Sequence, residues 1–332
     1  MKEVLKRVVK NLLYLKQALD RKQRLLLEKG DLIEQKDHLI ARKNEQLKQL
    51  SQEWKTRVPP GHFYSPIPSL EEVQQKEQRC PDLFTRMPEV IPGVTLNQER
   101  QLKLLDVFQE FYRELPFHEK QQPHLRYFFE NPSYSYSDAI FLYSIIRYAK
   151  PKRIVEVGSG YSSCVILDTN DLFFEGSIAC TFIEPYPDLL QSLIRDGDRS
   201  CTEILPQKLQ EIPLEKFVAL EAGDILFIDS THVSKFDSDV NHIFFNILPR
   251  LKSGVYIHFH DVFYPFEYPK AWIYEGRAWN EDYLLRAFLQ YNSQFEIVAF
   301  NTFLEHFYEE YFQQNMPLCL KNRGGSIWLR KM

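Results

Sequence analysis

From residue 137 to residue 330 the chain alternates short apolar runs with amphipathic segments, and this alternation constrains the fold more than any other feature. Runs of β-branched and aromatic residues predict strands, and apolar residues at helical spacing predict helices. The predicted strands are 153–157, 178–183, 202–205, 225–228, 255–259, 295–300 and 326–330. The predicted helices are 138–148, 162–169, 187–195, 239–251 and 280–291. Such alternation predicts a doubly wound α/β fold with a mostly parallel sheet that is covered on both faces.

The last two predicted strands depart from this rule. They are joined by a long segment that ends in Arg323-Gly324-Gly325, instead of by a single crossover helix. We therefore expect the final strand to run antiparallel to its neighbours.

The first 58 residues follow a different pattern. An apolar residue recurs every seven positions, at Leu5, Leu12, Leu19, Leu26, Ile33, Ile40, Leu47 and Trp54. This spacing predicts one long amphipathic helix over residues 1–58 that forms a coiled coil, and it suggests a homo-oligomer joined through that helix. Lysines stand at several companion positions of the heptad, so a solvated helix lying on the rest of the chain is the alternative.

Pro59-Pro60-Gly61 ends the predicted helix, because proline cannot continue its hydrogen-bond ladder. Residues 59–136 are predicted to be a Pro-rich linker and accessory helical region, with the clearest helix at 98–115. Residues 137–332 then form the α/β domain.

Composition and charge exclude several classes of protein. Hydrophobic residues make up 44% and charged residues 26%, which is typical of a globular chain. No run reaches the roughly 18 apolar residues of a transmembrane helix, and no signal peptide is evident, so we expect a cytoplasmic protein. The first 58 residues hold 15 basic against 8 acidic side chains, although the whole chain has a net charge of -4. No nucleic-acid motif accompanies this basic surplus.

The segment 155–163 joins a predicted strand to a predicted helix and contains Gly158 and Gly160. Glycines at such a turn let the backbone approach a ligand, and the following helix N-terminus favours an anionic group. Glu184 follows the second strand, where a carboxylate can accept both ribose hydroxyls of a nucleoside. These features together predict a nucleoside-binding site.

The spacing disfavours a nicotinamide dinucleotide, because the sixth position of the Gly-x-Gly-x-x-Gly fingerprint is Ser163. At these residues the sequence resembles the class I S-adenosylmethionine-dependent methyltransferases, whose first motif is an acidic residue followed by Gly-x-Gly. More narrowly, it is similar to the methyltransferase domain 24 group, which is related to cephalosporin-hydroxylase-like and rhamnosyl O-methyltransferase proteins. The resemblance covers residues 137–330. It implies a Rossmann-like, seven-stranded sheet with an antiparallel last strand, and S-adenosyl-L-methionine as the cofactor.

The resemblance also implies roles for individual residues. Glu156 would face the methionine ammonium group, and Gly158 and Gly160 would make room for the cofactor. Glu184 would bind the ribose hydroxyls. Ser162 stands where the family often has a third glycine. The adenine would be flanked, after the third strand, by Leu209 and Gln210.

A second group of polar residues follows the fourth and fifth predicted strands. Asp229 and His232 follow the fourth strand, and His260 and Asp261 end the fifth. Because ligands bind at the carboxyl ends of parallel strands, we expect Asp229 and Asp261 to converge. Such carboxylates, with an imidazole nearby, can hold Mg²⁺ or another divalent ion, or can act as acid and base. Metal-dependent O-methyltransferases resemble this sequence in placing carboxylates at these two strand ends.

These residues form the predicted reaction site. Asp229, His260 and Asp261 are the predicted metal ligands, and His232, Asp229 and Asp261 are the predicted catalytic residues, with His232 as the general base. His258 lies two residues before His260 on the same face of a strand, so one of the two is expected to be a buried core histidine. Asp229 has a simpler alternative role, which is to cap the following helical turn.

The aromatic and proline-rich segment 262–279 follows the fifth strand and is predicted to form a wall or lid over the acceptor, or to pack against the accessory region. The function predicted on these grounds is methyl transfer to a hydroxyl or amine of a small-molecule or glycan acceptor. The alternatives are a metal-dependent hydroxylase on the same scaffold and a non-catalytic coiled-coil scaffold protein.

Overall fold

The computed structural model describes residues 58–200 and 202–332, together with residues 16, 19, 21–23, 25–26, 29–30, 33 and 35–46 of the N-terminal segment. The chain divides into two compact units, residues 1–65 and residues 66–332, which are described separately.

In the first unit, every described residue between 16 and 46 is helical, as the heptad pattern predicts. The described heptad residues are Leu19, Leu26, Ile33 and Ile40, whose exposed fractions are 65%, 60%, 59% and 56%. The other heptad residues, Leu5, Leu12, Leu47 and Trp54, lie outside the described residues. The coiled coil and the homo-oligomer therefore stay predictions.

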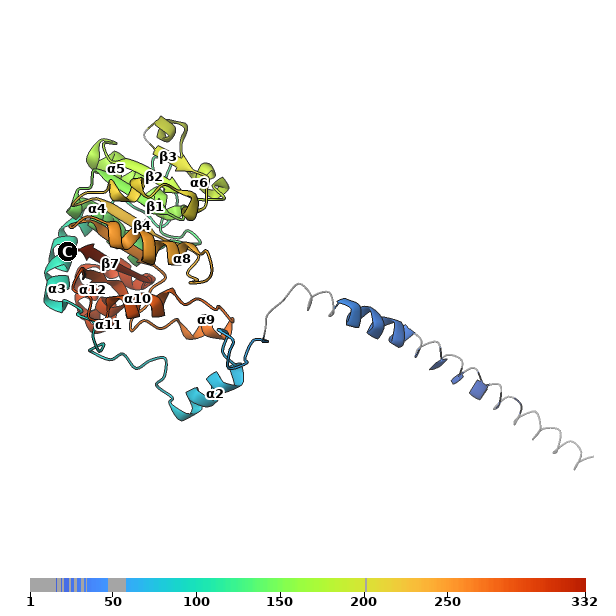
Figure 1. The fold of residues 1–332 in the computed structure, drawn as a ribbon. Helices are drawn as coiled ribbons and strands as arrows, with labels where there is room; N and C mark the ends of the chain where they lie inside the picture. Colours follow the sequence, from blue (N-terminus) through green and yellow to red (C-terminus); the bar gives the residue numbers. More distant parts are fainter. Residues whose placement is uncertain are drawn as a thin grey trace, which may run out of the picture. The chain divides into compact units, whose positions relative to one another are not determined.

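The second unit is built on one seven-stranded sheet with the order β3-β2-β1-β4-β5-β7-β6 (Figure 1). Strands β1 to β5 are parallel, and β7 is antiparallel to both of its neighbours, β5 and β6. The strands are β1 Arg153–Val157, β2 Ala179–Ile183, β3 Thr202–Leu205, β4 Ile225–Ile228, β5 Tyr256–His260, β6 Phe295–Phe300 and β7 Ser326–Lys331. The Rossmann-like fold and the antiparallel last strand are thus confirmed.

Helices precede the sheet and connect its strands. The α-helices of this unit are α2 Leu70–Arg79, α3 Gln98–Tyr112, α4 Tyr136–Ala149, α5 Tyr161–Phe174, α6 Asp188–Leu193, α7 Glu215–Val218, α8 Asp239–His242, α9 Lys270–Tyr274, α10 Glu281–Leu289, α11 Asn301–Phe307 and α12 Glu309–Asn315. Short 3-10 helices are η1 Asp196–Ser200, η2 Leu209–Glu211, η4 Leu248–Arg250 and η5 Pro317–Lys321, and η3 Ile243–Ile247 is a π-helix. No helix among the described residues is long and apolar enough to cross a membrane.

The helix predicted over residues 239–251 is wrong as a single regular helix. The structure has the short α8, then the π-helical η3, then the 3-10 helix η4. Pro249 lies inside η4 and has no backbone N–H to donate, which favours a break in the regular ladder. The buried faces of Phe244 and Ile247 keep the segment against the sheet despite the irregular backbone.

The hydrophobic core lies on both faces of the central strands. All residues of β4 and β5 are buried, as expected of parallel strands that are covered on both sides. On one side α3 packs against α4 through an edge-to-face contact between Phe108 and Phe141, with ring centroids 5.5 Å apart. On η3, Phe244 contacts Phe259 of β5 and Phe288 of α10. This packing fixes the carboxyl ends of β1, β2, β4 and β5 at one edge of the sheet.

Candidate active site

The glycine loop after β1 is pressed against the end of β4. The Asp229 N–H donates a hydrogen bond to the Val157 carbonyl oxygen at 2.8 Å. Gly158 has a φ of 78°, and a Cβ atom at this position would lie 1.9 Å from the Asp229 carbonyl oxygen. Only glycine fits this approach without displacing the backbone. Gly158 therefore sets the distance between the loop and Asp229.

Glu156 is fully buried and turned toward the first turn of α5. Its carboxylate accepts hydrogen bonds from the Ser162 hydroxyl at 2.6 Å and the Ser163 hydroxyl at 2.5 Å. Burial raises the pKa of Glu156 to about 8, although the two serines lower it. The carboxylate predicted to face the methionine ammonium group is thus bonded to two hydroxyls of α5, and its contact with the cofactor stays a prediction. It ties β1 to α5 and holds the glycine loop between them.

A cavity of about 390 Å³ opens beside this loop, at the carboxyl ends of β1, β2 and β4. Five of the residues predicted from the sequence line it: Gly158, Glu184, Leu209, Gln210 and Asp229. Glu184 is half-buried, and its carboxylate accepts hydrogen bonds from the Ser159 N–H at 3.3 Å and the Tyr186 N–H at 2.8 Å. Gly160 and Ser162 lie in the adjacent turn and do not line this cavity.

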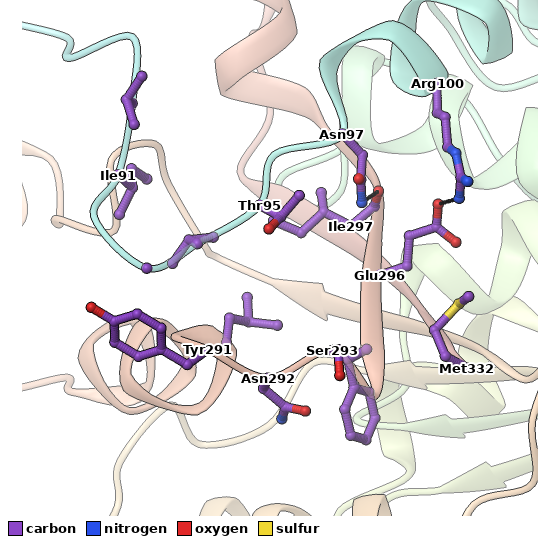
Figure 2. Close-up of a pocket in the computed structure, with 15 residues that line it drawn as sticks. Ile91, Thr95, Asn97, Arg100, Tyr291, Asn292, Ser293, Glu296, Ile297 and Met332 are labelled. Carbon is purple, nitrogen blue, oxygen red and sulfur yellow. Dashed lines mark hydrogen bonds and ion pairs between the residues drawn. The ribbon is translucent and has the colours of Figure 1, made fainter.

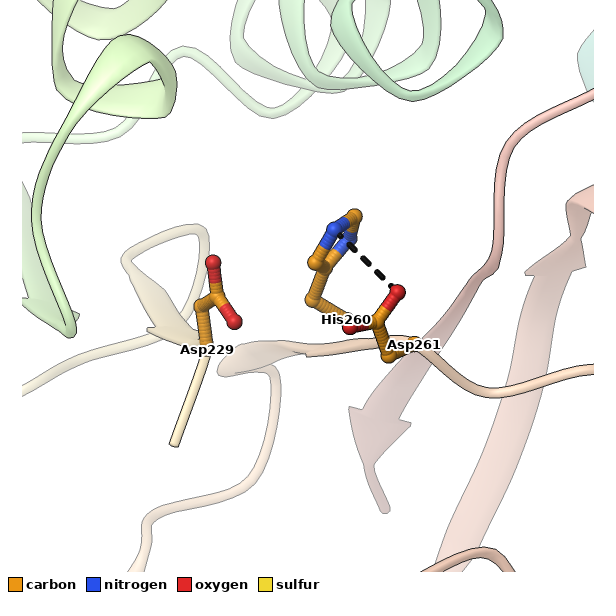
Figure 3. Close-up of side chains that lie close together, drawn as sticks. All are labelled: Asp229, His260 and Asp261. Atoms are coloured by element: carbon orange, nitrogen blue, oxygen red, sulfur yellow. Dashed lines mark ion pairs between the residues drawn. The ribbon is translucent and has the colours of Figure 1, made fainter. Parts of the chain in front are cut away.

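Asp229, His260 and Asp261 face one another across the ends of β4 and β5 (Figure 3). Each of them offers a ligand atom, and these atoms all lie within 4.8 Å of one another. His260 Nε2 is 3.5 Å from a carboxylate oxygen of Asp261. Two carboxylates and one imidazole are a donor set that suits a divalent cation.

His232 lies beside the two carboxylates, and both of its ring nitrogens face acidic groups. Nε2 is 3.4 Å from Asp229 and 3.6 Å from Asp261, and Nδ1 is 2.9 Å from Glu281 on α10. His232 and Asp261 both have a left-handed backbone, with φ angles of 59° and 55°. Such conformations are uncommon outside glycine and gather at functional sites.

The electrostatics of this group follow from burial and from three carboxylates close together. Burial lowers the pKa of His232, but the hydrogen bonds to Asp229 and Glu281 outweigh it and raise the pKa to about 10. The imidazole therefore carries a proton at neutral pH unless another cation compensates the carboxylates. Burial raises the pKa of Asp261, whereas the pKa of Asp229 is lowered because His260 and His232 outweigh burial there.

The family model for the methyltransferase domain matches residues 155–262, from β1 to the residues just after β5. This stretch contains the glycine loop, Glu184, His232 and the Asp229–His260–Asp261 cluster. An uncharacterized protein of Archaeoglobus fulgidus is 35% identical over 170 residues, which are 50% of this chain and 75% of the relative. The chain belongs to the methyltransferase domain family. It is an S-adenosylmethionine-dependent methyltransferase of class I.

Solved structures of methyltransferases are similar at lower identity. The O-methyltransferase TomG from Streptomyces achromogenes, in complex with SAM, is 16% identical, with a TM-score of 0.41 and coverage of 72% of this chain and 92% of that one. The SAH-bound methyltransferase PaMTH1 of Podospora anserina is 14% identical, with a TM-score of 0.38 and coverage of 81% and 100%.

Sequence reasoning missed Glu281 as a partner of His232, and it placed Trp279 in the aromatic segment 262–279 without a contact to His232. Glu281 is 1% exposed and bonds to Nδ1 of His232, and the Trp279 ring lies 4.4 Å from the His232 ring. Both come from the segment before and at the start of α10, about fifty residues away in sequence. The only signal that pointed there was the aromatic density of residues 262–279, which identifies no partner for Glu281. By contrast, His258 is the core histidine of its pair, because it is buried between Phe227 and Trp328.

A separate cavity of about 650 Å³ lies at the edge strand β6 of the methyltransferase (Figure 2). Its polar side chains bond to nearby groups: Arg100 forms an ion pair with Glu296, and the Asn97 amide donates to the Ile297 carbonyl oxygen at 3.4 Å. None of the residues predicted for the cofactor or the reaction lines it. We assign this cavity no part in methyl transfer.

Proposed function

We propose that this methyltransferase transfers a methyl group from S-adenosylmethionine to a small-molecule acceptor, whose reacting hydroxyl or amine is held at Asp229, Asp261 and His232. One observation carries the proposal. Asp229 lines the cavity beside the glycine loop and also belongs to the carboxylate cluster, so the proposed nucleoside site and the proposed acid–base site would meet at one residue. That is the arrangement an in-line methyl transfer needs, because both reactants must be held close together.

The residues around the 390 Å³ cavity fit the cofactor. Glu184 would accept the ribose hydroxyls, and Leu209 and Gln210 would flank the adenine. Gly158 leaves the space that a side chain would close. Glu156 acts indirectly in this proposal, since its bonds to Ser162 and Ser163 hold the loop in shape. When bound, the cofactor supplies the electrophilic methyl group.

Asp229, His260 and Asp261 would hold a divalent ion such as Mg²⁺. The donor set fits, because carboxylate oxygens suit hard cations and a single imidazole suits several divalent metals. Such an ion lowers the pKa of a hydroxyl that approaches it. This part of the proposal concerns only these three residues.

His232 would hold or accept the acceptor proton at Nε2. Glu281 bonds to Nδ1 and thereby turns Nε2 toward Asp229 and Asp261. A neutral imidazole among three carboxylates requires a further positive charge at the cluster. The general base and the divalent ion are therefore one proposal and are tested together.

Calorimetric titration with S-adenosylhomocysteine tests the cofactor site. We expect wild type and the exposed-site control Glu310→Gln to bind, and Glu184→Gln to bind at least tenfold more weakly, which corresponds to about 1.4 kcal/mol. If Glu184→Gln binds S-adenosylhomocysteine as tightly as the wild type does, Glu184 does not contribute to the cofactor site. Absence of binding by the wild type would defeat the proposed function.

Titration with Mn²⁺, followed by its electron paramagnetic resonance signal, tests the ion site. We expect wild type to take up the ion and Asp261→Asn to lose this uptake while still binding S-adenosylhomocysteine. If both proteins bind Mn²⁺ equally, the cluster is not the site, and the proton-transfer role of His232 loses its support.

No observation favours the two alternatives. A non-haem iron hydroxylase typically uses two histidines and one carboxylate, whereas the described cluster has one histidine and two carboxylates, with His232 engaged by Glu281. A non-catalytic scaffold would not need a left-handed His232 and Asp261 at the strand ends.

A further inference from the structure

A cavity of about 650 Å³ lies between the segment around α2 and residues 265–286. It shares no lining residue with the cavity that contains Glu184. Its walls carry aromatic rings, among them Phe84, Tyr268, Trp279 and Tyr283. The aromatic segment 262–279 thus forms part of a pocket, in addition to packing against the accessory region.

The cavity adjoins the reaction site along residues 277–281. Trp279 lines the cavity, and its ring lies 4.4 Å from the ring of His232. The N–H groups of Asn280 and Glu281 donate to the His232 carbonyl oxygen at 3.1 Å and 3.2 Å. A molecule in the cavity therefore rests against the side chain that contacts His232.

Basic side chains outnumber acidic ones in the cavity lining by three to two, which favours an anion. Lys76, Arg277 and Arg286 line it, and Lys76 and Arg286 form no ion pair with any residue that the structure describes. Of the two acids in the lining, Glu267 accepts a hydrogen bond from the Tyr283 hydroxyl at 2.5 Å. Glu72 lies in the first turn of α2, where the helix dipole compensates a negative charge.

Arg277 is held in place by its neighbours, and its terminal N–H groups remain available as hydrogen-bond donors. Its guanidinium lies over the Trp272 ring at 4.2 Å and over the Trp279 ring at 5.1 Å. Its Nε donates to Glu275 at 2.8 Å, which leaves the terminal nitrogens for a ligand. A stacked guanidinium is well suited to bind a carboxylate or phosphate through two parallel hydrogen bonds.

We propose that this cavity binds the acceptor, and that the acceptor is a ring compound that carries an acidic group. The ring would pack on the aromatic wall, and the acidic group would bind Arg277 and Arg286. This inference rests on the proposed methyl transfer for the identity of the ligand as an acceptor. A sugar acid and an aromatic acid share this chemistry.

Saturation-transfer NMR on the full-length protein tests the cavity with five probes. Glucuronate and benzoate have both a ring and a charge, glucose and phenol have a ring alone, and acetate has a charge alone. We expect one of the two ring acids to bind and the other three probes to bind at least tenfold more weakly. Binding of glucuronate assigns a sugar acid, and binding of benzoate assigns an aromatic acid.

Variants place the binding in the cavity. Arg286→Gln and Arg277→Gln are each expected to weaken binding of the ring acid at least tenfold, whereas Arg113→Gln, at an exposed arginine just after α3, leaves it unchanged. Binding of S-adenosylhomocysteine by each variant checks that the variant is folded. Unchanged binding in both cavity variants would overturn the proposal, as would equal binding of phenol and benzoate, equal binding of acetate and the ring acid, or no binding of either ring acid.

The two proposals fail in different ways. If S-adenosylhomocysteine binds to the wild type and no ring acid does, the methyltransferase function stands and the acceptor class is wrong. If a ring acid binds and S-adenosylhomocysteine does not, the cavity is a ligand site but the ligand is not shown to be a methyl acceptor.

Discussion

Glu156 illustrates how a motif can point to a residue without fixing the direction of its side chain. The motif locates an acid two residues before Gly158, and nothing in the spacing of a motif tells whether a side chain points to a ligand or to its own loop. The direction of the Glu156 side chain depends on Ser162 and Ser163, whose hydroxyls donate hydrogen bonds to its carboxylate. The orientation of such a side chain is decided by tertiary contacts.

Replacing Glu156 with glutamine should change how stability depends on pH. The pKa of Glu156 rises from its ordinary value of 4.5 to about 8 on folding, so the folded chain binds the proton more tightly. The stability it contributes is complete below pH 4.5 and is lost as the pH rises to about 8, by at most about 1.4 kcal/mol per pH unit. Urea unfolding at pH 5 to 9 should show Glu156→Gln gaining stability relative to wild type as the pH rises. Parallel curves for the two proteins would contradict this.

Gly158→Ala and Gly176→Ala form a matched pair. Both glycines have a positive φ, 78° and 71°, but a Cβ at Gly158 meets the Asp229 carbonyl and a Cβ at Gly176 meets nothing within 4 Å. We expect Gly176→Ala to cost about 1 kcal/mol from backbone strain. Gly158→Ala should cost about 1–3 kcal/mol more from overpacking, and it should also weaken S-adenosylhomocysteine binding. Thermal unfolding and calorimetry measure both effects, and equal losses in the two variants would show that the close approach is unimportant.

At the scale of elements, every strand end was predicted within one residue, because buried β-branched runs bounded by turns are distinctive in this sequence. The residues of the carboxylate cluster could be predicted because they lie at the carboxyl ends of β4 and β5. Glu281 and the split of helix 239–251 did not follow, because the first depends on which distant side chain packs beside His232 and the second on a local competition around Pro249. Helices α11 and α12 were missed in a segment whose many aromatic residues obscure any apolar period.

Arg126 joins elements that are separate in sequence. Its guanidinium, with a side chain only 2% exposed, forms ion pairs with Asp168 and Asp171 of α5 and with Asp198 of η1. Arg126→Gln would leave buried carboxylates unpaired, so we expect a loss of about 3–5 kcal/mol in the free energy of unfolding.

The control for Arg126 is Arg113→Gln, since that arginine pairs with Glu110 on an exposed face, with side chains 62% and 63% exposed. This variant should lose less than about 1 kcal/mol. Urea unfolding compares the two, and similar losses would mean that the buried ion pairs do not hold α5 to η1.

At the scale of the whole molecule, the N-terminal heptad is the feature least connected to the reaction. The described heptad residues Leu19, Leu26, Ile33 and Ile40 are more than half exposed, and we expect them to bury their apolar surface by self-association. The double variant Leu26→Asp, Ile33→Asp should reduce the mass measured by light scattering to that of one chain. The control double variant Gln35→Asp, His38→Asp adds two acids at positions outside the heptad residues and should keep the wild-type mass. A wild type that already has the mass of one chain would contradict the coiled coil.

The left-handed backbone at His232 and Asp261 has a genetic consequence. Asparagine tolerates this conformation better than most residues, and Asp261→Asn leaves no buried carboxylate without its partner, so an allele encoding Asp261→Asn should yield wild-type amounts of protein in the cell. β-Branched replacements at the same codon should instead lower abundance through strain. A phenotype seen with the asparagine allele therefore reports the missing chemistry, whereas one seen only with the β-branched alleles reports the missing protein.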